Sequence, residues 1–322
     1  MLKLIKRKNN IVSIKDHYLK RNKVLIKRRV GGFGDVLMQR MMIEDFSKTG
    51  LEIHYCCPFE YMDIMKNHPY LKELKEISKI KEEDYGVVYD ITTICAITES
   101  SLGSKNKKHR SDIWANYCGV ELKTHETYLK SNIENLNFYK QEIKKINVEN
   151  KKVVFISTKS KNNSDFGKAK SLNDYQICDL IKKLQEINCF VVTADEEFQE
   201  IYNELNIKQF VKLHTANWIA LIDACDYVIS VDTASFHIAG ALKKPLVGVF
   251  SFVDGKIYGK YYDFVLVQKH RDNGDWPCGP CYKHTTCIKD QINTKKPCIT
   301  ELTADEIVEG LKKLINRHQK VI

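Results

Sequence analysis

The last third of the chain contains an apolar run, a helical pattern and a second apolar run in close succession. The first run covers residues 227–231 and ends abruptly in the polar turn 232–235. The second covers 246–250, and the segment between the two runs has apolar residues at helical spacing. The spacing of the apolar residues, together with the polar turn residues between the runs, predicts a strand, a tight turn, a helix and a strand.

The same alternation recurs along the chain. Further predicted strands lie at 23–28, 51–57, 85–91, 151–157 and 189–194. Helical segments between them are predicted at 31–46, 61–69, 177–184 and 217–225. Strands separated by helices indicate parallel sheets with crossover helices. We therefore predict an α/β protein with two Rossmann-like domains facing a central cleft.

A polar stretch with scattered apolar residues, 131–151, separates the two sets of elements. We place the domain boundary there, which gives domains of 1–145 and 146–322. The length of 322 residues suits two domains of about 150 residues each. The last predicted helix begins at Thr303, and Glu306 stands in the position of a capping box.

The composition indicates in which cellular compartment the protein works and what kind of partner it binds. The basic N-terminus leads into no apolar segment, and no stretch approaches the roughly 20 apolar residues of a membrane span. Eleven cysteines without a secretory signal favour a reducing cytoplasm. The net charge of +10 favours an anionic partner: a nucleotide, a phosphorylated glycan, an acidic membrane surface or a nucleic acid.

Two polar sites lie where predicted strands end and helices begin. In the first, Gly31, Gly32 and Gly34 allow a tight turn and close approach of a ligand, and Asp35 follows at a helix N-terminus. The spacing differs from the dinucleotide motif G-x-G-x-x-G. The second site is the turn 232–235. In both places the polar side chains could simply cap a helix, or the helix N–H groups could bind a phosphate.

Two motifs in this order carry a family resemblance. The first reads GDVL over 34–37, and the second reads DTASFHIAGAL over 232–242, followed by Pro245. This pair resembles glycosyltransferase family 9, the heptosyltransferases of lipopolysaccharide synthesis, which have the GT-B fold. Ala234 stands where the family usually has glycine. The resemblance spans about 23–314 and implies transfer of a sugar from a nucleotide-sugar donor.

The resemblance also implies roles for the matching residues. Asp35 would be the general base that removes the proton of the acceptor hydroxyl. Lys170 would neutralise the donor diphosphate, with Lys168 as the alternative, and Asp195 or Glu196 would bind the ribose. Surface charge alone is the other interpretation of these lysines and acids. No catalytic metal is implied. The donor-binding residues are then Gly34, Lys170, Asp195, Asp232, Thr233, Ala234 and His237.

Four cysteines follow the second motif among turn residues, over 272–300. Their spacing, C-x2-C-x5-C-x10-C, suits a tetrahedral structural metal, although unbound thiols and disulfides are the alternatives. The layout resembles the cysteine-rich finger of some family members, including the autotransporter heptosyltransferases, where it holds iron. Iron and zinc are both compatible with four sulfurs. The ligands would be Cys278, Cys281, Cys287 and Cys298.

A basic run at 104–110 lies in the half that would receive the acceptor. It is a solvated loop, or a contact for phosphates on a lipopolysaccharide core or for nucleic acid. The resemblance implies a heptose, transferred from ADP-heptose to an anionic glycan in the cytoplasm, with peripheral contact to the inner membrane surface. The alternatives are the same fold acting on a protein or modified DNA, and a non-catalytic protein that binds nucleotide sugars or nucleic acid.

Overall fold

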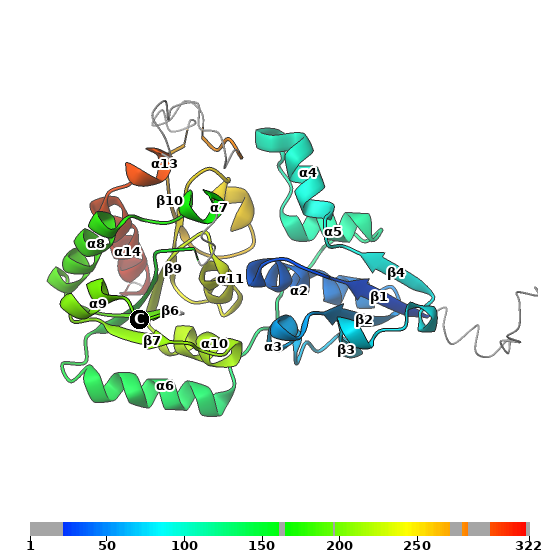
Figure 1. Cartoon of the computed structure of the whole chain (residues 1–322), viewed down its shortest axis with the longest axis horizontal. Helices are drawn as coiled ribbons and strands as arrows, with labels where there is room; N and C mark the ends of the chain where they lie inside the picture. The colour runs from blue at the N-terminus through cyan, green and yellow to red at the C-terminus, as the bar shows by residue number, and fades with distance from the viewer. Residues whose placement is uncertain (1–21, 161–164, 196, 271–278, 283–296, 320–322) are drawn as a thin grey trace, which may run out of the picture.

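The computed structural model describes residues 22–160, 165–195, 197–270, 279–282 and 297–319, which form two parallel β-sheets flanked by helices (Figure 1). The first sheet, with its helices, is called the N-terminal half. Its strand order is β3-β2-β1-β4. The strands are β1 (Lys23–Lys27), β2 (Glu52–Cys57), β3 (Glu73–Glu76) and β4 (Val87–Asp90). Its helices are α2 (Phe33–Ser47), η1 (Phe59–Tyr61), α3 (Met62–Met65), η2 (Ile77–Lys79), η3 (Glu82–Asp84), α4 (Ile94–Leu102), η4 (Gly103–Lys105) and α5 (Arg110–Tyr117).

The second sheet, with its helices, is called the C-terminal half, and its strand order is β10-β9-β8-β5-β6-β7. The strands are β5 (Lys152–Ser157), β6 (Cys189–Asp195), β7 (Lys208–Val211), β8 (Tyr227–Val231), β9 (Leu246–Phe250) and β10 (Val265–Gln268). The helices are α6 (Ile133–Ile146), α7 (Asp165–Lys168), α8 (Asp174–Glu186), α9 (Glu200–Glu204), α10 (Thr215–Ala224), α11 (Ala234–Ala241), α12 (Gly255–Tyr258), α13 (Pro297–Thr300) and α14 (Ala304–Gln319).

The predicted parallel α/β arrangement is confirmed, and each predicted strand is present within one or two residues of its expected limits. Sequence reasoning missed β3, β7 and β10, which lie at sheet edges. The first two read ELKE and KQFV, and neither contains a fully buried residue. A half-exposed edge strand needs no continuous apolar run, so the pattern gave no signal there.

The polar stretch 131–151 contains α6, which sequence analysis did not identify. Tyr139 and Ile143 are buried on one side of this helix, and α6 packs against α10 of the C-terminal half. Asn132 caps its start by accepting hydrogen bonds from the N–H groups of Glu134 and Asn135, both at 3.0 Å. A narrow apolar face on an otherwise polar helix explains why the segment resembled a linker.

The predicted capping box of the last helix is confirmed. The Thr303 N–H donates to Glu306 Oε2 at 2.8 Å, and the Glu306 N–H donates to Thr303 Oγ1 at 3.2 Å. The helix α14 then packs against α8 and the strands β9 and β10. The buried apolar residues of α8 and α14 form a layer on one face of the C-terminal sheet. Those of α10 and α11 contribute to the core on the other face.

The two halves meet where α2 packs against α11, in the middle of the molecule (Figure 1). At this contact Gly34 of α2 lies against the ring of His237 of α11, and a Cβ at position 34 would be only 2.6 Å from His237 Cδ2. Only glycine fits there without a shift of the neighbouring side chain. The contact brings the starts of the two helices, and therefore the two sequence motifs, to the same place.

Among the described residues, no helix has both the length and the apolar composition required to span a membrane.

Replacing Gly34 by alanine should destabilise the protein by about 1–3 kcal/mol, because the added methyl overpacks the contact between the halves. Thermal unfolding monitors this loss. Gly32→Ala is the matched control, since a Cβ at position 32 meets no atom within 4 Å. The double variant Gly34→Ala/His237→Ala should recover much of the stability, and additive effects of the two substitutions would contradict the proposed clash.

Candidate functional site

The first predicted site is a glycine turn between β1 and α2. Gly31 has a φ of +140°, and a Cβ at this position would be 1.9 Å from Arg28 Nη2. Glycine is therefore required both by the backbone conformation and by the closely packed arginine. The helix α2 has no side-chain cap hydrogen bond, so Asp35 does not act as its cap.

The Asp35 carboxylate lies between two arginines. Its Oδ2 accepts from Arg28 Nη2 at 2.6 Å, and its Oδ1 accepts from Arg110 Nη1 at 2.5 Å. Burial alone would raise the pKa of Asp35, but the charges of Arg110 and Arg28 outweigh it and hold the pKa below its usual value. Asp35 is therefore ionised at neutral pH.

Both arginines are themselves held in place. Arg28 donates to the carbonyl oxygens of Thr92 at 3.0 Å and Ile91 at 3.4 Å. Arg110 makes two further hydrogen bonds to Glu99. Sequence analysis left Arg110 in a basic run and gave Arg28 no role. The sequence gives little indication that these two arginines act together. Arg28 follows a strand, and Arg110 begins a helix 82 residues later.

The second site is built around a buried ion pair in the C-terminal half. Lys170 Nζ lies 2.6 Å from Asp232 Oδ2, and the two side chains are 10% and 5% exposed. Ser251 Oγ donates to the Ala169 carbonyl oxygen at 2.7 Å, which fixes the loop before the lysine. Lys168, the alternative in this loop, is exposed at the end of α7. The structure thus brings Lys170 to the polar turn and leaves Lys168 at the surface.

Thr233 occupies the N-cap position of α11, but its side chain makes no cap hydrogen bond. Its Oγ1 instead lies 3.2 Å from Ser230 Oγ and 3.3 Å from Ser157 Oγ. Ala234 begins the helix and is half-buried. Simple capping therefore does not account for this turn. Its first N–H groups, beside a lysine, form a suitable environment for an anion.

His237 connects the two sites. It is 3% exposed, and burial lowers its pKa to about 4, so that the ring is neutral at pH 7. One side of the ring packs against Gly34, and Nδ1 lies 3.4 Å from the Tyr262 hydroxyl. A neutral histidine adds no charge to the site, and its position fixes the spacing between α2 and α11.

Asp195 lies at the end of β6, on the same carboxyl edge of the sheet as the turn after β8. Burial raises the pKa of Asp195, and Thr193 Oγ1 donates to its Oδ2 at 3.2 Å. Ligands of open parallel sheets bind at this edge. Glu196, the alternative acid, lies outside the described residues.

The cysteine cluster is described only in part, because Cys278 and Cys287 lie outside the described residues. Cys298 is 7% exposed at α13, Cys281 is half-buried, and both contact the same apolar core. The backbone N–H of Tyr282 donates to the Phe252 carbonyl oxygen at 2.8 Å, which attaches this segment to the loop after β9. Within the described ranges, no group of three or more His, Cys, Asp or Glu residues is arranged to hold a metal.

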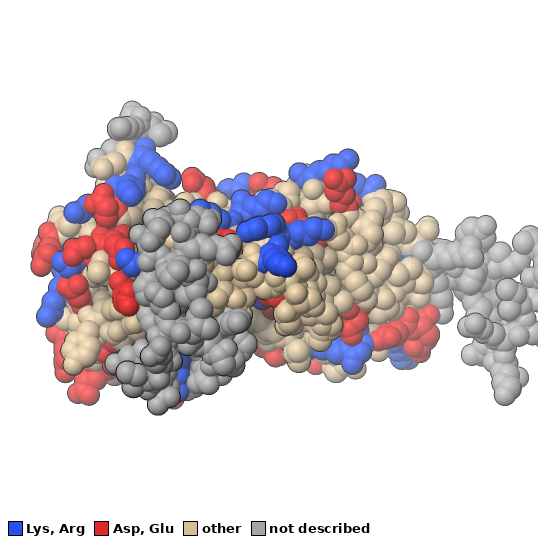
Figure 2. Space-filling model, turned by 90° about the horizontal axis from the view of Figure 1, so that it is seen from above, with Lys and Arg blue, Asp and Glu red and all other residues tan. Residues whose placement is uncertain are grey.

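The predicted basic run contains both exposed and buried residues. Lys105, Lys107 and Lys108 are exposed, while His109 is buried and caps α5. Seen from above, lysine and arginine side chains gather over the middle of the molecule (Figure 2). The run is therefore not a uniformly solvated loop, since its last residue, Arg110, reaches Asp35.

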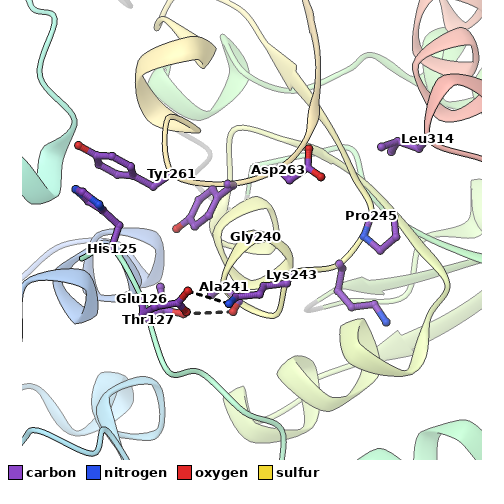
Figure 3. A pocket seen from close by; sticks show the side chains of 12 residues that line it. His125, Glu126, Thr127, Gly240, Ala241, Lys243, Pro245, Tyr261, Asp263 and Leu314 are labelled. Carbon is purple, nitrogen blue, oxygen red and sulfur yellow. Dashed lines mark hydrogen bonds and ion pairs between the residues drawn. The ribbon is translucent and has the colours of Figure 1, made fainter. Parts of the chain in front are cut away.

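A cavity of about 350 Å³ lies apart from both sites, between residues 125–127 and the C-terminal end of α11 (Figure 3). Lys243 and Glu126 form an ion pair of 2.9 Å at its wall. None of the predicted donor-binding residues lines this cavity. Tyr262 lines the cavity and also approaches His237 of the site.

Three solved structures with the same fold have low sequence identity to this chain. The glycosyltransferase family 9 protein from Veillonella parvula has a TM-score of 0.67 at 11% identity, over 93% of this chain and 98% of that chain. Heptosyltransferase II of E. coli, an ADP-heptose lipopolysaccharide heptosyltransferase, has a TM-score of 0.61 at 14% identity, over 92% of this chain and 99% of that chain.

A third similar structure is the dodecameric iron-containing heptosyltransferase TibC from enterotoxigenic E. coli, in complex with ADP-D-β-D-heptose. Its TM-score is 0.66 at 16% identity, over 93% of this chain and 78% of that chain. A search of curated protein sequences finds no match. These likenesses establish the GT-B fold.

The sequence model of glycosyltransferase family 9 (heptosyltransferase) matches residues 108–289. This range includes Arg110, the Lys170–Asp232 pair and the complete second motif, and it covers more than half of the chain. The protein is therefore a glycosyltransferase, and the chain belongs to glycosyltransferase family 9.

Proposed function

We propose that this enzyme transfers a heptose from ADP-heptose to a hydroxyl of an anionic glycan. The observation that carries the proposal is the meeting of two charged sites across the α2–α11 contact. One is an ionised carboxylate, Asp35, and the other is the Lys170–Asp232 pair at the N-terminus of α11. Structures similar in fold include enzymes described as acting on, or in complex with, ADP-heptose.

In this proposal the donor diphosphate binds at the start of α11. Lys170 and the helix N–H groups offset its charge, Thr233 contributes its hydroxyl, and Asp195 contacts the ribose. Gly34, Ala234 and His237 border the same space. The acceptor hydroxyl attacks the anomeric carbon, the bond from that carbon to the phosphate oxygen breaks, and ADP leaves with the bonding electrons. Asp35 takes the hydroxyl proton.

An anionic acceptor is proposed because the face around the basic run is rich in exposed lysine. Lys105, Lys107 and Lys108 are exposed and directly precede α5, the helix that carries the Asp35 partner Arg110. Positive charge near the catalytic carboxylate would attract phosphate groups on a glycan. A thermal-shift comparison of ADP, GDP and UDP, followed by ADP-heptose, tests the donor. Stabilisation by GDP or UDP alone would contradict the proposed nucleotide.

Lys170→Gln and Thr233→Val should each weaken ADP binding by about tenfold or more, since each removes a contact to the diphosphate. Isothermal titration calorimetry measures the change. Lys168→Gln is the matched control, because that lysine is exposed and lies two residues away. Weaker binding in the control but not in Lys170→Gln would move the phosphate site to Lys168.

Asp35→Asn should lower transfer by roughly 10²-fold or more, as expected for the loss of a general base, with little change in ADP affinity. Initial rates with ADP-heptose and a phosphorylated core glycan measure this. Asp63→Asn is a suitable control, since Asp63 pairs with Lys66 at the surface. Wild-type rates in Asp35→Asn would remove this carboxylate from the mechanism.

We also propose that Cys278, Cys281, Cys287 and Cys298 together bind one structural iron or zinc ion. The spacing supports this, as does the position of Cys281 and Cys298 against one apolar core. The segment 272–300 is polar, rich in turn residues and poor in large apolar residues. Metal binding would then contribute directly to the free energy of folding of this segment.

Cys281→Ser should lose the metal and lower the thermal stability, whereas Cys178→Ser on α8 should leave the metal content unchanged. Elemental analysis of protein purified without chelators measures both. Near-zero metal in the wild-type protein, with all four cysteines accessible to thiol titration, would contradict the site.

A further inference from the structure

A second carboxylate lies behind Asp35. Glu99, on α4, accepts two hydrogen bonds from the Arg110 guanidinium: Nε donates to Oε1 at 2.7 Å and Nη2 donates to Oε2 at 2.6 Å. The remaining terminal nitrogen, Nη1, donates to Asp35 at 2.5 Å. Because a guanidinium is planar, the paired bonds to Glu99 fix the direction in which Nη1 points.

Tyr258, on α12 of the C-terminal half, completes this group. Its hydroxyl donates to Glu99 Oε1 at 3.0 Å, and Arg110 Cζ lies 4.9 Å from the centre of its ring. Glu99 and Arg110 belong to the N-terminal half. Tyr258 can therefore make these contacts only while the two halves are together, as they are in this structure.

The burial of these groups favours a role in the site over a role in stability. The side chains of Glu99, Arg110 and Asp35 are 12%, 19% and 15% exposed. Taking three charged groups largely out of water carries a desolvation cost that such pairs seldom recover as stability. Surface ion pairs of this protein avoid that cost. In the Lys66–Asp63 pair, for example, the side chains are 55% and 37% exposed.

We propose that Glu99 is a positioning residue that holds Arg110 with Nη1 directed at Asp35, and that Tyr258 supports this arrangement from the C-terminal half. The inference rests on the proposed role of Asp35 as the base. Arg28, the other cation at Asp35, is held by the backbone carbonyls of Ile91 and Thr92, which belong to a different segment from Glu99. Loss of Glu99 should therefore release one of the two cations and leave the other in place.

Besides Glu99 and the Lys170–Asp232 pair across the α2–α11 contact, four titratable groups among the described residues interact with Asp35, and these four carry no charge at neutral pH. Burial lowers the pKa of His237 to about 4 and raises the pKa of the neighbouring tyrosine and cysteine side chains. These groups are His237 of α11, Tyr61 of η1, Tyr55 of β2 and Cys95 of α4. The two arginines thus dominate the ionisation of Asp35.

The test is a titration of the Asp35 carboxyl carbon in protein labelled with ¹³C at aspartate carboxyls, where the resonance is assigned by its loss in Asp35→Asn. In Glu99→Gln the amide offers only one acceptor oxygen, and its NH2 group faces an arginine donor, so the paired bonds are lost. With Arg110 released, burial dominates and the titration midpoint should rise by about one pH unit or more.

The sign of the shift distinguishes positioning from charge alone. Removing a nearby negative charge, with Arg110 unmoved, would lower the midpoint of Asp35, because its carboxylate would be stabilised. A midpoint that falls or stays unchanged in Glu99→Gln therefore overturns the proposal. Tyr258→Phe, which keeps the ring over Arg110 but loses the hydroxyl, should raise the midpoint by a smaller amount.

Glu76→Gln is the matched control, because Glu76 pairs with Lys79 on the surface and should leave the midpoint unchanged. Thermal unfolding and ADP affinity verify that each variant is folded. The titration needs no sugar substrate, so failure of ADP-heptose as a donor would contradict the proposed function without affecting this test. If transfer does occur, Glu99→Gln should lower it by about tenfold or more, because the Asp35 carboxylate is no longer held in one orientation by Arg110.

Discussion

The close contact of Gly34 with the His237 ring is the constraint on which the arrangement of this enzyme depends. Each motif lies at the start of a helix, α2 or α11, and each helix follows a strand of a different sheet. The two helix starts share one space only because position 34 has no side chain to keep them apart. The proposed chemistry, with a base opposite a phosphate site, therefore depends on the absence of a side chain at position 34.

Charge is distributed unequally across this contact. On the N-terminal side, Asp35 is held between Arg28 and Arg110, and on the C-terminal side Lys170 is paired with Asp232. The charged groups are fixed by backbone carbonyls, by Glu99 and by the loop before Lys170. Preorganised charge of this kind stabilises charge that develops during reaction, because little reorganisation is needed when the leaving group departs.

The low identity to structures of the same fold, 11–16%, shows how little of the chain must be retained. Parallel sheets with crossover helices place the carboxyl ends of their strands on one edge, whatever the detailed core residues are. The two sequence motifs that the chain shares with the family are short segments at this carboxyl edge.

The sequence by itself determined the parallel α/β class, the central strands and the two motifs. Buried strands such as β5 and β8 are continuous apolar runs, and glycines or acids at helix starts are local signals. Edge strands such as β3 gave no such pattern, because they are only half-buried.

Only the tertiary structure decided which charges meet. Arg110 reaches Asp35 across 75 residues of sequence, and Tyr258 reaches Glu99 across 159. Lys170 is directed at Asp232, while Lys168 two residues earlier is exposed. Which charged residues pair depends on their distance in space. The sequence gives the residue type but does not show whether a charged side chain is buried or at the surface. For that reason the pattern of the chain could locate the site but not assemble its ion pairs.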